Sequence, residues 1–118
     1  MIEVTLPIKT VNESNGQHGH WAAKSRRREK QREAVGRVLR TKRLPPLPVR
    51  VTLTRISAGQ LDAHDNLRGA LKSIADEVAE LYGLPDKDAR FVWEYAQERC
   101  PPKQFGVRIR IEPADERY

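Results

Sequence analysis

Residues 61–88 read LDAHDNLRGALKSIADEVAELYGLPDKD, and this stretch decides the fold around it. Its apolar residues recur at spacings of three and four, which is typical of a helix with one buried stripe. The stripe is formed by Leu67, Ala70, Leu71, Ile74, Val78 and Leu81. Gly83 ends such a helix, and Pro85 prevents its continuation. The stretch therefore predicts an amphipathic helix with one face in the core.

The segments on both sides of this helix alternate apolar and polar residues, which predicts strands. They are residues 2–8, 49–54, 91–96 and 105–111. A further helix with a thinner apolar stripe is expected over about residues 21–39. The order β-α-β-α-β-β predicts an α/β fold, with two helices packed on a mixed sheet and a hairpin between the last two strands. We expect one domain over residues 1–113 and a flexible tail at 114–118.

The composition, 38% hydrophobic and 32% charged residues over 118 positions, is that of a soluble protein with a single core. No segment approaches the roughly 20 apolar residues that a membrane span needs. The N-terminal residues MIEVTLPIK lack the apolar core of a signal peptide. Cys100 is the one cysteine, which excludes an internal disulfide and a multi-cysteine zinc site. We expect a cytoplasmic protein with no membrane partner.

The net charge of +6 is unevenly distributed along the chain. Between Trp21 and Arg43 ten basic residues face only Glu29 and Glu33, so this stretch carries +8 and the rest of the chain −2. The basic residues are Lys24, Arg26, Arg27, Arg28, Lys30, Arg32, Arg37, Arg40, Lys42 and Arg43. A solvated surface is the usual role of a charge run. Unpaired like charges destabilise a helix, however, so this density favours a partner rich in phosphate, such as a nucleic acid.

Acidic residues stand at both ends of the helix predicted within residues 61–88. Asp62 and Asp65 come just before it, and Asp86 and Asp88 come just after it. If the four converge at one sheet edge, carboxylates about 4 Å apart repel by roughly 4 kcal/mol at an effective dielectric of about 20. A divalent metal would relieve that repulsion. As alternatives, Asp62 and Asp65 fit a helix cap, and Asp86 and Asp88 fit an ordinary turn.

Several other polar residues could take part in the chemistry, and Lys72 and His64 each have two possible roles. Lys72 lies about 10 Å along the helix from Asp65, and its side chain leans toward the helix start, so it could stabilise charge on a phosphate. Alternatively, Lys72 pairs with Asp76, which is about 16 Å from Asp65 and cannot share a metal with it. His64, between the acids, could bind the metal or tune the local charge. His18 and His20 form a weaker candidate pair for a transition metal.

Taken together, these motifs resemble the RusA-like Holliday junction resolvases, especially the short proteins encoded by phages and prophages. The resemblance is carried by D-x-x-D-N-L with A-L-K following, then a Gly turn and D-x-D before an aromatic strand. Upstream it covers a loop with Ser14, Asn15, His20 and Trp21 and the basic residues 24–32. The resemblance implies a homodimeric, Mg²⁺-dependent endonuclease that cuts four-way DNA junctions, with Mn²⁺ as a possible substitute.

The resemblance also implies roles for individual residues. Asp65 and Asp88 correspond to essential acids and Asp62 to a third, with Asp86 as an additional metal ligand. The family's lysine falls on Gly69, which leaves Arg68 or Lys72 to replace it, and Asn66 would orient the acids by hydrogen bonding. The residues expected to contact branched double-stranded DNA are Asn15, Lys24, Arg26, Arg27, Arg28, Lys30, Arg32 and Arg68.

Two other functions fit the same residues. One is a phage DNA-binding or regulatory module that kept the scaffold and lost cleavage, and the other is a metal-dependent nucleotide phosphohydrolase. A homodimer is also expected because the basic helix has a thin apolar stripe. The aromatic residues of the third strand, Phe91, Trp93 and Tyr95, would then add apolar surface beyond what one small core can use.

Overall fold

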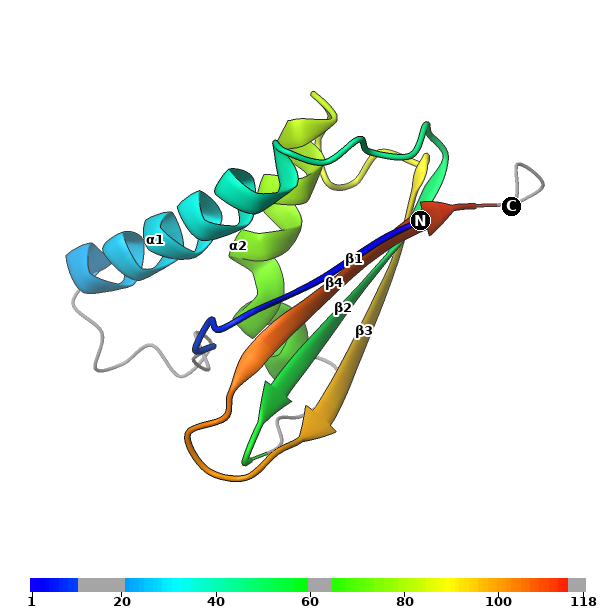
Figure 1. Ribbon diagram of the computed structural model, residues 1–118. Coiled ribbons are helices and arrows are strands. Elements are labelled where there is room, and N and C mark those ends of the chain that lie inside the picture. The colour runs from blue at the N-terminus through cyan, green and yellow to red at the C-terminus, as the bar shows by residue number, and fades with distance from the viewer. Residues whose placement is uncertain (11–20, 60–64, 115–118) are drawn as a thin grey trace.

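The computed structural model describes residues 1–10, 21–59 and 65–114, with the side chain of Asp65 outside the description. In chain order the elements are β1 (Ile2–Leu6), α1 (Trp21–Leu39), β2 (Val49–Ser57), α2 (Asp65–Leu81), β3 (Phe91–Arg99) and β4 (Gly106–Pro113). Both helices lie on the same face of the sheet, so the molecule has two layers (Figure 1). The predicted α/β fold, its element order and the mixed sheet are confirmed.

The strands are arranged in the order β1-β4-β2-β3. β2 and β3 are parallel, whereas β4 is antiparallel to both β1 and β2. The predicted hairpin between β3 and β4 is therefore wrong, since β2 lies between them. β2 and β4 carry the most completely buried apolar residues and take the two central positions. The link between β3 and β4 contains Pro101 and Pro102, which do not favour a tight two-residue hairpin turn.

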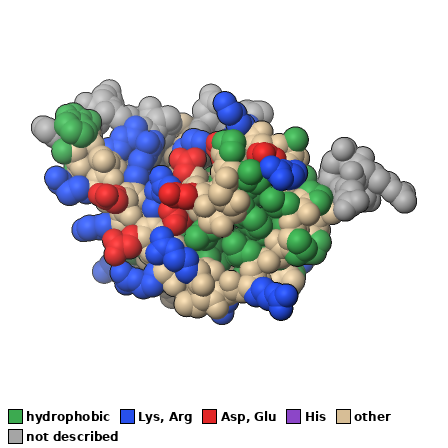
Figure 2. Space-filling model, turned by 90° about the horizontal axis from the view of Figure 1, so that it is seen from above, with side chains coloured by type: hydrophobic (Ala, Val, Ile, Leu, Met, Phe, Trp, Pro, Cys, Tyr) green, Lys and Arg blue, Asp and Glu red, His purple; other side chains and the backbone are tan. Residues whose placement is uncertain are grey.

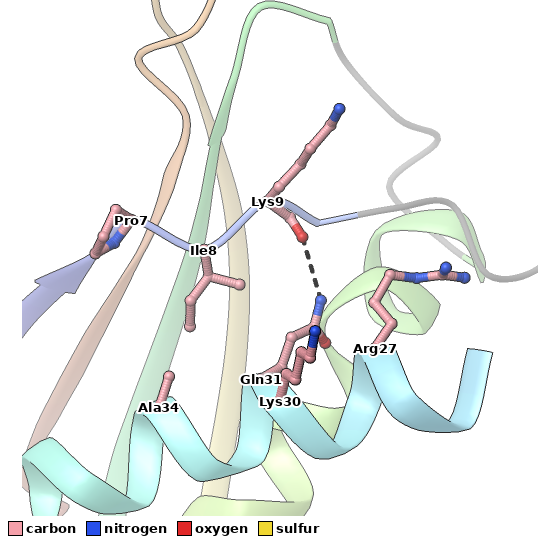
Figure 3. A pocket seen from close by; sticks show the side chains of 7 residues that line it. All are labelled: Pro7, Ile8, Lys9, Arg27, Lys30, Gln31 and Ala34. Atoms are coloured by element: carbon pink, nitrogen blue, oxygen red, sulfur yellow. Dashed lines mark hydrogen bonds between the residues drawn. The ribbon is translucent and has the colours of Figure 1, made fainter. Parts of the chain in front are cut away.

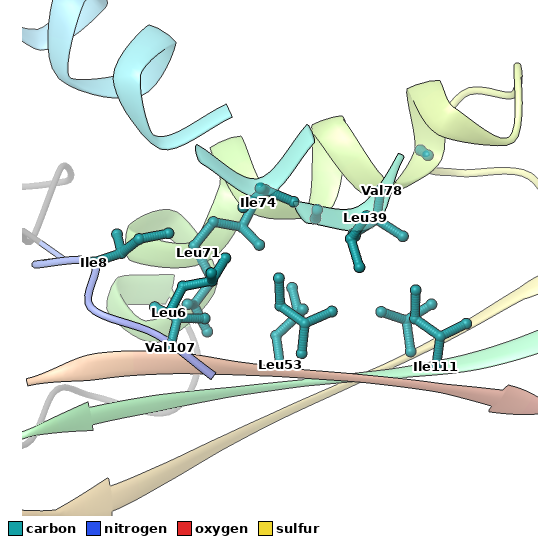
Figure 4. Close-up of a cluster of buried hydrophobic side chains, with 14 of the residues drawn as sticks. Leu6, Ile8, Leu39, Leu53, Leu71, Ile74, Val78, Val107 and Ile111 are labelled. Atoms are coloured by element: carbon teal, nitrogen blue, oxygen red, sulfur yellow. The ribbon is translucent and has the colours of Figure 1, made fainter. Parts of the chain in front are cut away.

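The core lies between the sheet and α2 (Figure 4). From β2 it takes Val49, Val51 and Leu53, and from β4 Val107, Ile109 and Ile111, all fully buried. The predicted stripe of α2 packs against these two rows, with Leu71, Ile74 and Val78 fully buried as well. The register pairs Val51 with Ile111 and Leu53 with Ile109, so side chains of adjacent strands meet on the helix-covered face.

The aromatic residues of β3 belong to this same layer. Phe91 is buried, and its ring lies 5.2 Å from that of Trp93 and 5.6 Å from that of Tyr82. Trp93 and Tyr95 pack half-buried against the core. These side chains therefore help to cover the core of their own chain, and the expected homodimer stays a prediction.

The helix α2 ends as its sequence predicts. Gly83 adopts a φ of 70°, a left-handed conformation that glycine accepts without steric cost. The amide of Gly83 donates to the carbonyl of Glu80 at 2.8 Å, and that of Leu84 donates to Ala79 at 3.1 Å. The last carbonyls of the helix are thereby satisfied, and the chain turns back toward β3.

The helix α1 is attached to α2 largely through polar contacts around Glu77. The Glu77 side chain is 7% exposed and accepts from Arg32 Nε at 3.1 Å, while Arg40 lies 3.5 Å from its other oxygen. Arg32 also pairs with Glu80. Gly36 lies against this carboxylate, because a Cβ added there would come within 2.7 Å of Glu77 Oε2. A glycine is what allows the two helices to approach so closely.

A second buried contact reinforces this attachment. The amide of Gln31 donates to the carbonyl of Lys9 at 3.2 Å, and its oxygen accepts from the hydroxyl of Ser73. Gln31 is buried, so both of its polar ends need these partners. It joins α1 to α2 and to the segment that follows β1.

We expect Glu77→Gln to lower the free energy of unfolding by about 1–3 kcal/mol, because it removes the charge from a buried acceptor with two arginine partners. Urea denaturation followed by circular dichroism measures this. Glu80→Gln is the matched control: the Glu80 side chain is 66% exposed, so its loss should cost less than about 1 kcal/mol. Equal losses in the two variants would contradict the anchoring role of Glu77.

Candidate nucleic-acid interface and acidic site

The first half of α1 projects from the body of the protein. All the buried residues of this helix lie in its second half: Gln31, Val35, Gly36 and Leu39. Residues 21–30 are exposed or half-buried, and Trp21 is 77% exposed. Figure 1 shows the start of α1 extending away from the sheet, and Figure 2 shows Lys and Arg side chains gathered along this part of the surface.

Most of the predicted DNA-binding residues lie on this projecting half. They are Lys24, Arg26, Arg27, Arg28 and Lys30. The structure gives Arg32 a different role, since its guanidinium is held by Glu77 and Glu80. Arg32 therefore joins the two helices and is not positioned as a free phosphate contact. Asn15 lies outside the described residues.

A cavity of about 350 Å³ opens between α1 and the segment after β1. Its wall combines the apolar side chains Pro7, Ile8 and Ala34 with Lys9, Arg27, Lys30 and Gln31 (Figure 3). The side chain of Lys9 extends away from α1, whereas its carbonyl is bound by Gln31 (Figure 3). Positive charge thus continues from the first half of α1 to Lys9, which follows β1.

The predicted acidic site falls partly outside the described residues. Asp62 and His64 lie in that part of the chain, as do His18 and His20. The backbone of Asp65 begins α2, followed directly by Asn66. The roles of these residues in metal binding stay predictions.

The acids at the other end of α2 have cationic partners of their own. Both oxygens of Asp88 accept from the Arg90 guanidinium, at 2.9 and 3.0 Å, and one also accepts from the Arg90 amide. These hydrogen bonds hold the pKa of Asp88 at about 2, so it is ionised at neutral pH. Lys72 Nζ lies 2.5 Å from Asp86 and 2.9 Å from Asp76. The hydrogen bonds to Asp86 and then Asp76 raise the pKa of Lys72.

The convergence of the two predicted acid pairs stays a prediction, because Asp62 and the side chain of Asp65 lie outside the described residues. In the parallel pair, Phe91 lies beside Val49 and Arg99 beside Ser57, so Asp86 and Asp88 precede the amino end of β3. The Arg68 guanidinium, in the first turn of α2, is 5.5 Å from the ring centre of Tyr95, the middle residue of β3. Lys72, which binds Asp86, lies seven residues after Asp65, about 10 Å along α2. Across the described ranges, no three His, Cys, Asp or Glu side chains form a group that could hold a metal.

One buried cation, Arg55, is not among the site residues predicted from the sequence. β2 continues beyond the predicted segment to Ser57, which places Arg55 in the helix-facing row after Leu53. Arg55 is 7% exposed, donates from Nε to the Thr10 hydroxyl at 2.9 Å and from a terminal nitrogen to the Gly59 carbonyl at 2.8 Å. Burial lowers the pKa of Arg55. The signal was available, since Arg55 is the next inward position of the alternation Val49, Val51, Leu53.

Comparison with known proteins adds no identification: no family model matches the chain, and no curated protein matches it either. No helix in the parts of the chain that the structure describes is long and apolar enough to cross a membrane. The charges, positions and sequence motifs of the chain's own residues are therefore what support a function.

If the projecting half of α1 binds phosphates, DNA affinity falls steeply with salt, with a log–log slope of roughly 0.9 per neutralised phosphate. Replacing Arg26, Arg27 and Arg28 with Ala should flatten that slope by up to about two to three units, as measured by fluorescence anisotropy at several salt concentrations. A variant with Lys87, Arg108 and Arg110 changed to Ala loses the same net charge elsewhere and serves as the control. Equal slopes in both variants would indicate that the cations of α1 form only a solvated surface.

Proposed function

We propose that this protein is a Mg²⁺-dependent, structure-selective endodeoxyribonuclease that resolves four-way DNA junctions as a homodimer. The observation that carries the proposal is the projecting half of α1, which presents a dense row of cations without burying any of its residues. Such a row suits the phosphate backbone of DNA, which dominates affinity and is sequence-independent. The motif D-x-x-D-N-L at the start of α2 supplies the resemblance to junction resolvases.

The donor set at the start of α2 fits the proposed metal. Mg²⁺ is usually bound through one or two carboxylates, with water and substrate phosphate completing its octahedron. Asp62 and Asp65 supply two carboxylates, and Mn²⁺ suits the same ligands. When bound, the metal supplies Lewis-acid polarisation of the scissile phosphate and activation of the attacking water. Asn66 would orient the carboxylates by hydrogen bonding.

Between the two basic candidates on α2, the contacts favour Arg68 as the residue that reaches a phosphate. The Lys72 ammonium is shared by Asp76 and Asp86, so its charge is largely neutralised. Arg68 is exposed and rests over the ring of Tyr95 near the first turn of α2. Its guanidinium can bind a phosphate in the bidentate manner while it stays stacked on that ring.

The homodimer offers Asp86 and Asp88 a place in the proposed centre. Within one chain they follow the end of α2, where Asp86 binds Lys72, about 10 Å along the helix from Asp65. A twofold-related copy could place Asp86 and Asp88 of one chain beside Asp62 and Asp65 of the other. Two such composite centres would face a substrate that is itself twofold symmetric.

Asp65→Asn should abolish cleavage of a four-way junction and leave junction binding unchanged or tighter, because it removes a negative charge near the phosphate. The assay compares junction, flap and linear DNA in Mg²⁺, in Mn²⁺ and in EDTA, with binding measured in EDTA. Asp76→Asn is the matched control on the same helix and should retain cleavage. Full cleavage activity of Asp65→Asn would contradict the proposed metal centre.

Mixing two inactive variants tests how the centre is assembled. If it is composite, Asp65→Asn and Asp88→Asn should each be inactive, yet a mixed dimer should cleave, because one of its two centres contains both native acids. If each centre belonged to one chain, the mixed dimer would hold no complete centre and stay inactive. Light scattering should also return about twice the chain mass of 13.5 kDa. A strict monomer, free and DNA-bound, would contradict the dimer.

A second function, that of a junction-binding module without cleavage, is favoured by one observation. Asp86 and Asp88, two of the four predicted ligands, are already paired with Lys72 and Arg90. Tight junction binding with no cleavage in either metal would establish this function in place of the nuclease. Hydrolysis of free nucleotides without any DNA cleavage would instead indicate a nucleotide phosphohydrolase.

A further inference from the structure

The helix-facing rows of the sheet change character along their length. In β2 the fully buried Val49, Val51 and Leu53 are followed on the same face by Arg55 and Ser57. In β3 the aromatic residues are followed on that face by Gln97 and Arg99, which the register places beside Arg55 and Ser57. The carboxyl end of the parallel pair is thus polar and cationic where its amino end is apolar. Ligands of α/β sheets bind at the carboxyl ends of parallel strands.

Arg55 is the buried centre of this polar end. Its acceptors among the described residues, the Thr10 hydroxyl and the Gly59 carbonyl, are neutral groups. Within the described ranges, no ion pair joins Arg55 to a carboxylate, although the guanidinium is 7% exposed. A buried charge is strongly unfavourable unless an opposite charge accompanies it. Arg55 is therefore suited to bind an anion.

A cavity of about 300 Å³ gives such an anion access to Arg55. Lys9 and Lys103 bring two further positive charges to its wall, Thr10 and Ser57 bring hydroxyls, and no carboxylate lines it among the described residues. Lys103 holds a φ of 71°, which a residue with a side chain adopts at a cost and which is typical of functional positions. Phe105, one-third exposed, forms an aromatic part of the wall.

We propose that this cavity binds one nucleotide unit, with its phosphate on Arg55, Lys9 and Lys103 and its base against the ring of Phe105. Three cations and two hydroxyls suit phosphate oxygens, and aromatic rings stack on any base. The volume lies at the lower end of the range for ligand sites and suits a unit of this size. That the nucleotide belongs to a DNA strand rests on the proposed function.

The central test is Arg55→Met, which keeps the length of the side chain and removes its charge. We expect junction affinity in EDTA to fall about 10-fold or more and the salt slope to flatten by about one unit. We also expect the melting temperature of the free protein to stay level or rise, because an uncompensated buried charge is gone. Arg50→Met is the matched control: Arg50 lies on the opposite face of β2, paired with Glu94 and Glu112, and its loss should leave junction affinity unchanged.

Small ligands identify what the cavity recognises. Inorganic phosphate, deoxyadenosine monophosphate and deoxyadenosine are each titrated against the full chain, with the melting temperature as the readout. The two phosphates should stabilise the native protein and the nucleoside should not, and Arg55→Met should abolish the response. Phe105→Leu should weaken the response to the nucleotide and spare that to inorganic phosphate. A response to neither phosphate, with an effect on DNA alone, would restrict the site to a strand.

Two outcomes would overturn the site. One is a destabilised Arg55→Met with native junction affinity, which would make Arg55 a structural residue. If Arg55→Met does not fold, the test variant is Lys103→Gly, because glycine accepts the positive φ without cost. The second outcome that would reject the proposal is a Lys103→Gly variant with unchanged affinity for phosphate and for the junction. Because binding is measured in EDTA, the result is independent of cleavage. Loss of binding in Arg55→Met from a protein that never cleaves would refute the nuclease and leave the nucleotide site standing.

Discussion

The buried carboxylate of Glu77 is the contact on which the arrangement of the two helices depends. Only Val35 and Leu39 of α1 are fully buried apolar side chains, too few to fix how this helix lies on α2. Arg32 and Arg40 reach Glu77 from positions about two turns apart, and Gly36, between them, lets the backbone of α1 approach the carboxylate. These polar contacts involve only the second half of α1 and Arg40, which follows it. As a consequence, the first half extends beyond the sheet and can carry a density of positive charge that a packed helix could not.

Positive charge continues from the first half of α1 to the carboxyl end of β2. Lys9 lines both the cavity beside α1 and the cavity that contains Arg55. Its carbonyl is fixed by Gln31, which in turn is held by Ser73 of α2. The polar contacts of Gln31, which help to hold α1, therefore also place Lys9 between the two cavities. In the proposed nuclease this gives a DNA backbone a continuous row of cations, from Arg27 and Lys30 through Lys9 to Arg55.

Local patterns predicted the elements well, because burial on one face leaves a periodic trace in the sequence. The three-and-four spacing of Leu67 to Leu81 and the alternation in β2 and β4 reflect contacts with one continuous core. Strand neighbours were harder, since the hairpin expectation considered chain proximity, whereas β4 pairs with β1 and β2 through contacts distant in sequence. Arg55 was missed because an arginine that follows an alternating segment is ordinarily taken as its exposed end. The parallel crossover also separates the two ends of α2, because a helix that joins two parallel strands starts at one end of the sheet and ends at the other.

Most of the acids in the stretch that predicted a metal have cationic partners within the chain. Residues 62–88 contain seven acids, and five of them have described cationic partners: Asp76 and Asp86 share Lys72, Glu77 and Glu80 contact Arg32, and Asp88 holds Arg90. The repulsion that called for a divalent cation is therefore relieved by the protein itself over most of this stretch. Of the four predicted metal ligands, Asp62 and Asp65 are the two whose side chains lie outside the described residues. In the proposed nuclease, a DNA phosphate would bring oxygen ligands to a magnesium ion that two carboxylates alone do not saturate. In the proposed nuclease, substrate and metal would then bind cooperatively, each supplying charge that the other lacks.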